Sequence, residues 1–488
     1  MPPLWLLAIL NLVGSIDSLR IRHKLSTRCP KRWKEDGERI HMNTTRIMVY
    51  SHDAFGLGNL RRMLAICEHL LKHWPNLSIL LVSGSPMIHE FRLPQGLDYI
   101  KLPCLNRGVS GELSAKYLGT SIEETVALRS HLIYSAAVHF KPNLLLVDKK
   151  PTGLRGELAN TLSYLQQTVP ENKRVLLLRD ILDTPEKTID EWCRWGHHHA
   201  IQTHYDQVLV AGVQSVFDLV QEYRLPLPIA HKVRYCGYIR KQLTGHEQVD
   251  PRAQLGIKPT DSLVLVTPGG GEDGFSLVHT YLEGLKLIQA LPPRRQTADD
   301  EPSLDLSDVT GPIIHSLILS GPEMPIEQRS RLEELAAGCS SISFQSFTTD
   351  LLSYLQAADA VVSMGGYNTL TEILMLGKRT VVVPRIHPSQ EQLIRAINFA
   401  KKGWITMVHP EQVTGRSLIQ AVLDLLYQPF LPPERMATRP KHRSESLDLN
   451  GLPQISGYLS ALLASAQQPI PDLMTKSVLV PPFMGWLA

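Results

Sequence analysis

The chain has 488 residues and a net charge of +3 at pH 7, with 43% hydrophobic and 20% charged residues. This length exceeds one hydrophobic core and predicts two or three domains, and the composition is that of a globular protein. The small net charge gives no reason to expect a nucleic-acid partner. No two of the six cysteines are spaced as CxxC. This argues against a zinc ribbon, a redox motif or a disulfide framework, and it favours reduced thiols in a cytoplasmic compartment.

Residues 1–41 do not fit the pattern of the rest of the chain. The apolar run LWLLAILNLVG is far shorter than the roughly 20 residues of a membrane-spanning helix, and no basic residue precedes it, as a secretory signal requires. Seven basic residues follow between Arg20 and Lys34. One interpretation is a membrane-surface anchor. We favour an extension or a misplaced start, because MNTTRIMVYSHD begins at Met42, directly before the first predicted strand.

From Met42 onwards, short apolar runs alternate with helical patterns. Nearly continuous apolar runs are typical of strands buried on both faces of a parallel sheet. Between the first two runs, apolar residues recur at helical spacing from Leu60 to Leu71 and predict an amphipathic helix. The first set of predicted strands is RIMVYS (46–51), SILLVS (78–83), NLLLVD (143–148), RVLLLR (174–179) and DQVLVA (206–211).

A second set of strands follows, again separated by helical segments. It comprises SLVLVT (262–267), HSLILS (315–320), SISFQ (341–345), AVVS (360–363) and TVVVP (380–384). Two successive sets of alternating strands and helices predict an α/β protein with two Rossmann-like domains. We place them at 42–232 and 233–432, with a tail at 433–488 that holds one helix at 456–466. The polar, Pro- and Asp-rich segment 292–312 reads as a surface insertion without catalytic interest.

Three Gly-rich turns each follow a predicted strand. They lie in YSHDAFGLGNLRRMLAIC (50–67), TPGGGEDG (267–274) and SMGGYNTLTE (363–372). A strand, a Gly turn and a helix start direct free backbone N–H groups and the positive helix end towards one point, which suits a phosphate. None of the turns matches the dinucleotide fingerprint GxGxxG with its distant acid, or the P-loop GxxxxGK[ST]. Dinucleotide reduction and ATP hydrolysis therefore have little support.

Polar residues near the third turn have two interpretations each. We expect Thr371 and Glu372 in about the first turn of a helix, where Glu372 either complements the helix N-terminus or accepts hydrogen bonds from ribose hydroxyls. PSQEQ (388–392) follows the strand end at Arg385 and belongs to the same rim. Its polar residues either form an ordinary helix start or face a ligand. The only His cluster, GHHHA (196–200), has no ligand-spaced acidic or Cys neighbours, so no metal and no cofactor are expected.

The run ADAVVSMGGYNTLTEILMLGKRTVVVPR, followed by EQLIRA, resembles the C-terminal domain of the MurG-like glycosyltransferases. Residues 50–62, RDILD (179–183) and YCGYI (235–239) are similar to a bacterial group of predicted glycosyltransferases of this type. The resemblance covers about 42–430. It implies a GT-B fold, with two Rossmann-like domains facing each other across a cleft, and transfer of a sugar from a nucleotide-diphosphate donor.

By this resemblance, the second domain binds the donor, which we expect to be a UDP-sugar. The Gly residues of the second and third turns would approach the diphosphate, Glu372 would hold the ribose, and Glu391 and Gln392 would face the donor sugar. GT-B enzymes neutralise the leaving diphosphate with helix dipoles and backbone amides rather than a metal ion. The expected donor-binding residues are Gly269, Gly270, Gly271, Ser363, Gly365, Gly366, Asn368, Thr369, Glu372, Arg385, Glu391 and Gln392.

The first domain would then receive the acceptor, with Gly56, Gly58, Asn59 and Arg61 as acceptor-binding residues. Inverting transfer needs a general base near the acceptor hydroxyl. The resemblance places a His where this chain has Asn59, and an amide does not take up a proton at neutral pH.

Three readings of Asn59 remain. The base lies elsewhere, with His52 and Asp53 as the catalytic candidates; or the family His serves binding and is replaced tolerably by Asn; or this member has lost catalysis.

Three functions follow from these observations. The first is an inverting, metal-independent transferase that moves a hexose or N-acetylhexosamine. The others are a nucleotide-sugar 2-epimerase and a non-catalytic nucleotide-sugar-binding protein. MurG-like enzymes often act on lipid-linked or hydrophobic acceptors, so the resemblance also implies a cytoplasmic protein with peripheral contact at the inner face of a membrane.

Overall fold

The computed structural model describes residues 44–52, 58–108, 112–240, 250–289, 313–348, 350–427 and 447–467. These residues fall in one compact unit that starts at Thr44. Four of the predictions lie outside the described residues, because they concern the extension 1–41, Asp53, Gly56 and the insertion 292–312. We use "first lobe" for residues 44–240 with 447–467, and "second lobe" for 250–427.

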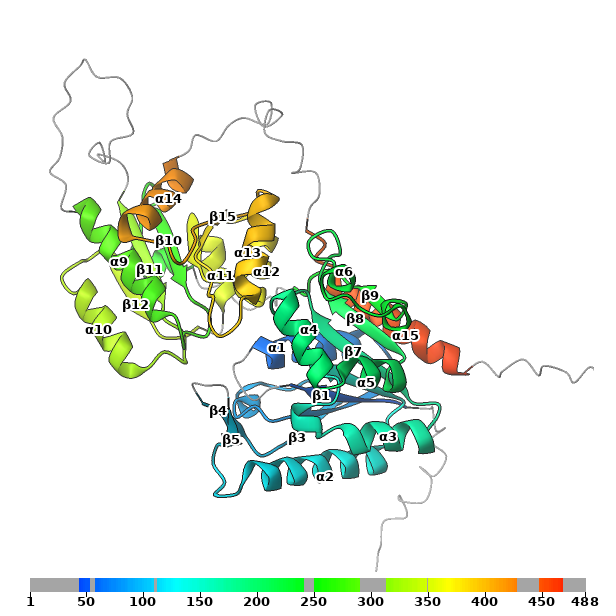
Figure 1. The fold of residues 1–488 in the computed structure, drawn as a ribbon. Helices are drawn as coiled ribbons and strands as arrows, with labels where there is room; N and C mark the ends of the chain where they lie inside the picture. The colour runs from blue at the N-terminus through cyan, green and yellow to red at the C-terminus, as the bar shows by residue number, and fades with distance from the viewer. Residues whose placement is uncertain are drawn as a thin grey trace, which may run out of the picture. The chain divides into compact units, whose positions relative to one another are not determined.

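The first lobe is built on a seven-stranded sheet in the order β3-β2-β1-β6-β7-β8-β9, in which every pair is parallel (Figure 1). All five strands predicted for this half are confirmed within one residue at either end. The strands are β1 Thr45–Ser51, β2 Leu77–Ser83, β3 Leu97–Lys101, β6 Leu144–Asp148, β7 Lys173–Arg179, β8 Gln207–Ala211 and β9 Val233–Tyr235.

Both faces of the first sheet are buried, which explains the unbroken apolar runs in the sequence. In β1, Ile47 and Val49 join the core on the side of α1, whereas Met48 and Tyr50 join the core with residues of α2 and α3. The helix predicted near 60–71 is α1, Gly58–His73. A capping box between Ser121 and Glu124 starts α2, Ile122–Phe140.

The remaining elements of the first lobe are shorter. They are η1 Ile88–Glu90, the antiparallel pair β4 Leu105–Arg107 and β5 Leu113–Ala115, η2 Leu154–Gly156, α3 Ala159–Thr168, α4 Pro185–Arg194, α5 His197–His204, α6 Leu219–Glu222 and α7 Leu227–Ala230.

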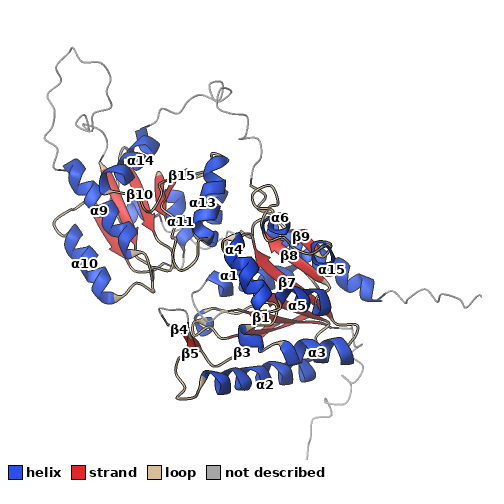
Figure 2. Cartoon of the chain, viewed as in Figure 1, coloured by secondary structure: helices blue, strands red, loops and turns tan. Residues whose placement is uncertain are grey.

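The second lobe contains a six-stranded parallel sheet in the order β12-β11-β10-β13-β14-β15 (Figure 2). The five strands predicted here are confirmed, with end shifts of at most two residues. The strands are β10 Ser262–Thr267, β11 Ile314–Leu319, β12 Ile342–Gln345, β13 Ala360–Ser363, β14 Arg379–Val382 and β15 Thr406–Met407. The helices are α8 Pro251–Gln254, α9 Phe275–Gln289, α10 Ile326–Ala336, α11 Leu351–Ala357, α12 Tyr367–Met375, α13 Glu391–Lys401 and α14 Gly415–Tyr427.

The helix predicted in the tail is confirmed as α15, Gly451–Gln467, and it returns to the first lobe. It packs against α1, and the Trp74 indole donates a hydrogen bond to Ser456 Oγ at 2.9 Å. Ile239 and Asn450 form an isolated antiparallel bridge just before it. The chain therefore leaves the first lobe, builds the second, and finishes on the first.

Two further findings concern the described residues only. No helix among them is long and apolar enough to cross a membrane. The five cysteines described, Cys67, Cys104, Cys193, Cys236 and Cys339, are free thiols.

Candidate functional site

Two of the predicted Gly turns lie side by side in the second lobe. The strands that precede them, β10 and β13, are paired, with Thr267 opposite Ser363, so both turns leave the same edge of the sheet. Gly269 has a φ of +89°, and a Cβ built on it would lie 3.8 Å from the Thr369 hydroxyl. The carboxyl edge of a parallel sheet is where open α/β folds bind ligands.

The start of α12 lacks a side-chain cap. Its N-cap residue is Gly366, with φ −60° and ψ 142°, which makes no side-chain cap hydrogen bond. A Cβ built on Gly366 would meet nothing within 4 Å. The first-turn N–H groups and the positive end of the helix dipole are therefore oriented for an anion.

Packing explains some of these glycines and not others. A Cβ on Gly271, at φ +97°, would lie 2.3 Å from the Ser320 carbonyl oxygen, and one on Gly365, at φ +85°, would lie 3.2 Å from Val382. Both positions therefore need glycine for the fold itself. Gly366 needs no positive φ and has open space, so a close ligand is the better explanation there.

Acidic side chains surround the GGG turn. A Cβ on Gly270 would come within 2.7 Å of a Glu323 carboxylate oxygen. Burial raises the pKa of Glu323, and the carboxylates of Glu272 and Asp273 raise it further. Asp273 is paired with Arg385 at 2.9 Å. A diphosphate here would meet backbone donors within a partly neutralised acidic rim.

The structure places Glu372 away from the helix start. It is the sixth residue of α12, and no acidic residue lies in the first turn of that helix, so the first-turn position expected for Thr371 and Glu372 is wrong. The helix starts earlier than expected, at Tyr367, directly after Gly366. Glu372 is half-buried. The Arg61 guanidinium has its pKa lowered by loss of solvent, an effect opposed by the carboxylates of Glu372 and Glu323.

Glu391 and Gln392, at the start of α13, are engaged within the protein. Glu391 pairs with Arg179 at 2.9 Å, and with Arg395 and Arg385 at 3.5 and 3.6 Å. Burial would raise the pKa of Glu391, but these arginines together with Lys149 lower it to about 2. The Gln392 amide oxygen accepts a hydrogen bond from the Arg385 backbone N–H at 3.3 Å.

Lys149 is a residue that the sequence analysis missed. It follows β6, and its φ of +66° is uncommon for a residue with a side chain. Burial, together with the positive charge of Arg179, lowers the pKa of Lys149 to about 7. An amine with this pKa is a group that exchanges protons near neutrality. Only the positive φ marks this position, and no sequence pattern reveals a positive φ on a lysine.

In the first lobe, the Asn59 side chain is used within the protein. Its amide nitrogen donates to the His52 carbonyl oxygen at 3.1 Å, and its amide oxygen accepts from Arg62 at 3.1 Å. Arg62 in turn pairs with Asp148 at 2.7 Å in a buried contact. His52 itself is buried. Asn59 thus joins the end of β1 to α1, which is a structural role for this amide.

A hydrogen bond joins the start of α12 in the second lobe to the start of α1 in the first lobe. The Asn368 amide nitrogen donates to the Gly58 carbonyl oxygen at 3.2 Å. Arg62 lies over the ring of Tyr367, with 5.9 Å from the guanidinium carbon to the ring centroid. The structure therefore places Gly58 next to Asn368, and Arg62 next to Tyr367.

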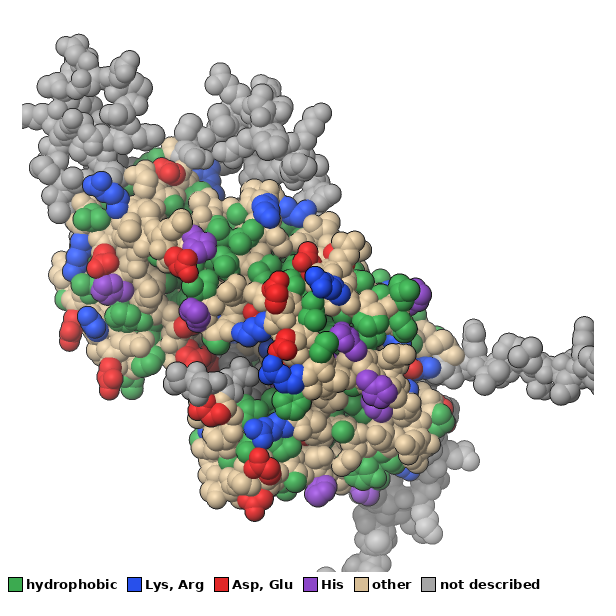
Figure 3. Space-filling view, viewed as in Figure 1, with side chains coloured by type: hydrophobic (Ala, Val, Ile, Leu, Met, Phe, Trp, Pro, Cys, Tyr) green, Lys and Arg blue, Asp and Glu red, His purple; other side chains and the backbone are tan. Residues whose placement is uncertain are grey.

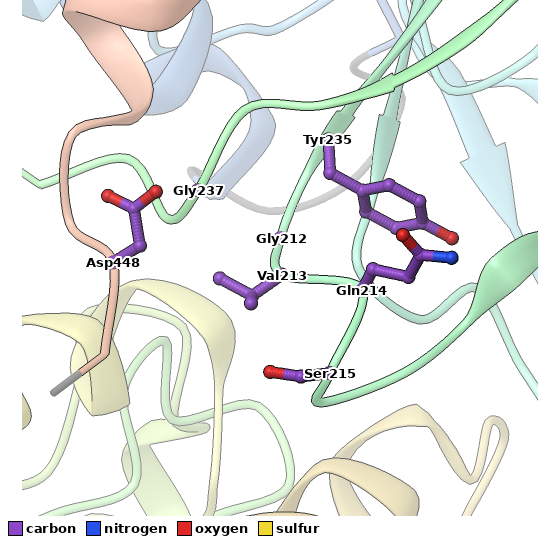
Figure 4. A pocket seen from close by; sticks show the side chains of 7 residues that line it. All are labelled: Gly212, Val213, Gln214, Ser215, Tyr235, Gly237 and Asp448. Atoms are coloured by element: carbon purple, nitrogen blue, oxygen red, sulfur yellow. The ribbon is translucent and has the colours of Figure 1, made fainter. Parts of the chain in front are cut away.

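A separate cavity of about 490 Å³ lies in the first lobe, next to the ends of β8 and β9 (Figure 4). The side chain of Asp448 reaches it from the segment before α15. The Asp448 carboxylate accepts hydrogen bonds from the Asn450 backbone N–H and from the Gln454 side-chain amide. None of the predicted site residues lines this cavity, whose walls are Gly212, Val213, Gln214, Ser215, Tyr235, Gly237 and Asp448.

Charge is mixed over the visible face of the molecule. Figure 3 shows acidic and basic side chains interspersed there, without a broad field of one sign. Within the described ranges, no group of three or more His, Cys, Asp or Glu side chains is arranged to hold a metal ion.

Comparisons with known proteins find similarity over part of the chain. Residues 285–448 match the model of the glycosyltransferase family 28 C-terminal domain. The UDP-N-acetylglucosamine–N-acetylmuramyl-(pentapeptide) pyrophosphoryl-undecaprenol N-acetylglucosamine transferase of Desulforamulus reducens is 40% identical over 75 residues, which is 15% of this chain and 20% of that protein. The chain thus spans about a fifth of the length of this curated relative.

Solved structures share the fold over most of their length. Acinetobacter baumannii MurG superposes with a TM-score of 0.51 at 14% identity, covering 86% of this chain and 99% of that one. The kitacinnamycin glycotransferase superposes with a TM-score of 0.55 at 13% identity, covering 86% and 98%. This chain therefore has the two-lobed GT-B fold, and its residues 285–448 are similar to the glycosyltransferase family 28 C-terminal domain.

Proposed function

We propose that this chain transfers a hexose or N-acetylhexosamine from a nucleotide-diphosphate sugar, preferably a UDP-sugar, to an acceptor hydroxyl. One observation carries the proposal. Paired strands β10 and β13 end in adjacent Gly turns, and the second turn opens into a helix without a side-chain cap. Backbone donors and a helix dipole directed at one point are what a leaving diphosphate requires.

On this proposal the two turns do different work. The α12 start and Gly269 contact the diphosphate, because both leave room for a ligand to approach the backbone. Glu372, farther along α12, accepts hydrogen bonds from the ribose. Glu391 and Gln392 act on the sugar indirectly, since both are engaged with arginines. No step in this scheme uses a metal ion.

The first lobe supplies the acceptor side. His52, buried at the end of β1, is the described candidate for the base, together with Asp53. The base removes the proton from the acceptor hydroxyl, whose oxygen attacks the anomeric carbon as the bond to the nucleoside diphosphate breaks, which inverts the configuration. The name of the relative from Desulforamulus reducens contains an undecaprenol-linked acceptor, and by this analogy we propose a lipid-linked or hydrophobic acceptor. We further propose that the protein is cytoplasmic and meets that acceptor at the membrane surface.

The experiment is a mass-spectrometric screen of nucleotide sugars with the purified chain, measuring binding and slow hydrolysis. Gly366→Ala and Gly269→Ala should weaken nucleoside-diphosphate binding tenfold or more, because the added methyl group blocks approach to the backbone. Gly338→Ala is the matched control, since Gly338 has a φ of +86°, open space and no place in the site. Absence of binding across the whole nucleotide panel would refute the proposal. Interconversion of the free UDP-sugar without an acceptor would identify an epimerase instead, and binding without hydrolysis or transfer would identify a pure binding protein.

A further inference from the structure

A fully buried arginine links the first lobe to the third Gly turn. Arg395 of α13 has no exposed surface and is among the largest buried side chains. Its Nε and Nη2 donate to the two oxygens of Asp180, both at 2.8 Å. Its Nη1 donates to the Gly365 carbonyl oxygen at 3.1 Å. One rigid guanidinium therefore fixes a carboxylate that follows β7 and a carbonyl that follows β13.

The carboxylate at the other end of this link is itself held. Asp180 lies directly after β7, is buried, and accepts a third hydrogen bond from the Tyr238 hydroxyl at 3.1 Å. Its neighbour Arg179 pairs with Glu391 at 2.9 Å, and Asp183 accepts from the backbone N–H of Gln390 at 3.0 Å. The RDILD segment thus contacts α13 and the residue before it through three side chains, those of Arg179, Asp180 and Asp183.

The Gly365–Gly366 turn, which accepts the hydrogen bond from Arg395, leads directly into the start of α12. Gly365 has a φ of +85°, and it precedes Gly366, whose following N–H groups open towards the proposed diphosphate. The Arg395 hydrogen bond to its carbonyl fixes the orientation of the peptide between Gly365 and Gly366. Replacing a buried ion pair by well-packed apolar residues is often neutral or stabilising, so stability is a weak explanation for this pair.

We propose that Asp180 is a positioning residue for the donor: through Arg395 it fixes the Gly365–Gly366 peptide and so sets the affinity of the turn for a nucleoside diphosphate. This inference rests on the proposed function, because it assumes that the Gly365–Gly366 turn binds the donor. Asp180, in the first lobe, then influences a donor contact in the second lobe through Arg395.

The chain contains a matched control for the energetics of a buried pair. Within the first lobe, Arg129 donates through Nε and Nη2 to the two oxygens of Glu157, at 2.5 and 2.8 Å. Its Nη1 donates to the Pro103 carbonyl oxygen at 2.7 Å, and the Tyr50 hydroxyl donates to Glu157 at 2.5 Å. This cluster has the same bidentate pair, carbonyl and tyrosine as the Asp180 cluster, but no contact with a Gly turn of the second lobe.

The test compares the two clusters with UDP as the probe. Asp180→Asn and Arg395→Lys are paired with Glu157→Gln and Arg129→Lys, and calorimetry gives the Kd for UDP well below each unfolding temperature. All four variants should lose stability, but only the first two should weaken UDP binding, by tenfold or more. The double variant D180N/R395K should bind no more weakly than the weaker single variant, because both changes break one link.

A second readout needs no ligand. Hydrogen exchange of the amides at 365–369 should accelerate in Arg395→Lys and remain unchanged in Arg129→Lys, which keeps the test open if Asp180→Asn does not fold. UDP affinity within twofold of wild type in both Asp180→Asn and Arg395→Lys would overturn the inference while leaving the proposed function intact. Failure of the wild-type chain to bind any nucleoside diphosphate would instead remove the proposed function, and with it this inference.

Discussion

The Gly turns of the two lobes begin alike in sequence but are completed differently. After β1 in the first lobe, the Asn59 amide bridges the His52 carbonyl and the Arg62 guanidinium. After β13 in the second lobe, the N-cap is Gly366 and the helix start has no side-chain cap. On either side of the first turn, the described residues are thus joined by side chains, whereas the helix start after the third turn has no side-chain cap.

This difference teaches which part of a Gly-rich motif signals a ligand. A glycine alone is ambiguous, because the fold itself needs several of them at a positive φ. Gly271, for example, has no room for a Cβ beside the Ser320 carbonyl. The informative combination is a glycine with open space next to a helix start that no side chain caps. Gly366 satisfies both conditions.

The largest effect should come from the glycine that packing requires. Gly271→Ala forces a residue with a Cβ to a φ of +97° and against a backbone oxygen, so we expect it to cost about 3–5 kcal/mol of stability. Gly338→Ala, at a similar φ but in open space, should cost only about 1–2 kcal/mol. Urea unfolding of both variants measures the difference. Equal losses would show that the backbone near Ser320 yields, and that Gly271 is no more constrained than Gly338.

The next effect concerns acid sensitivity at the start of α13. The cations around Glu391 lower its pKa to about 2 in the folded protein, below its ordinary value of 4.5. A depressed carboxyl pKa gives stability that is fully present above pH 4.5 and is lost as the pH falls towards 2. The shift corresponds to about 3 kcal/mol at pH 7, of which about 2 kcal/mol should be gone by pH 3.

Glu391→Gln tests this assignment. The variant should be less stable than wild type at pH 7, and the gap should narrow at pH 3, as measured by urea unfolding at both pH values. The exposed residue Glu327 on α10 provides the control, and Glu327→Gln should leave the pH dependence unchanged. A gap between wild type and Glu391→Gln that stays constant from pH 7 to pH 3 would contradict the ion-pair account.

The sequence predicted the central strands of both sheets because each is a continuous apolar run buried on both faces. In the two parallel sheets the missed strands are β3, β9 and β15, which all lie at sheet edges and are short or interrupted by charge, as in LDYIK and VRY. The short antiparallel pair β4 and β5 was also missed. Runs this short, or interrupted by a charged residue, show neither a continuous apolar stretch nor a clear alternation. The neighbours in the sheet, rather than the local residues, decide that these segments pair.

The site residues likewise differ in whether a local sequence pattern predicts them. The Gly turns were predictable because glycine after a strand is a local signal. The link between Asp180 and Arg395 joins positions 215 residues apart, and no local pattern connects them. In the sequence RDILD carries only a resemblance, and its contacts with α13 exist only in the folded chain. The position of Glu372 was wrong because the boundary of α12 depends on where Gly366 allows the helix to begin.

A third prediction concerns the proposed contact between Glu372 and the ribose in the second lobe. Glu372→Ala should weaken UDP binding about tenfold, since one hydrogen-bonded charged group typically contributes about 1.5–3 kcal/mol. Stability should change little, because the side chain is only half-buried. The exposed Glu333→Ala on α10 is the control for loss of one negative charge. If both variants bind UDP like wild type in calorimetry, Glu372 does not hold the ribose.

The smallest effect should come from Asn59, whose side chain connects the end of β1 to α1. Asn59→His replaces an amide that donates to one partner and accepts from another, and an imidazole cannot reproduce both contacts in the same geometry, so we expect about 1 kcal/mol of lost stability. On the proposed function turnover should not rise, because Asn59 joins β1 to α1 and the proposed base is His52 or Asp53. Turnover assays on Asn59→His and His52→Ala separate these roles: the first should change activity little and the second should reduce it strongly. A large gain in Asn59→His would mean instead that Asn59 stands in place of a base, and that this chain has lost catalysis through that one residue.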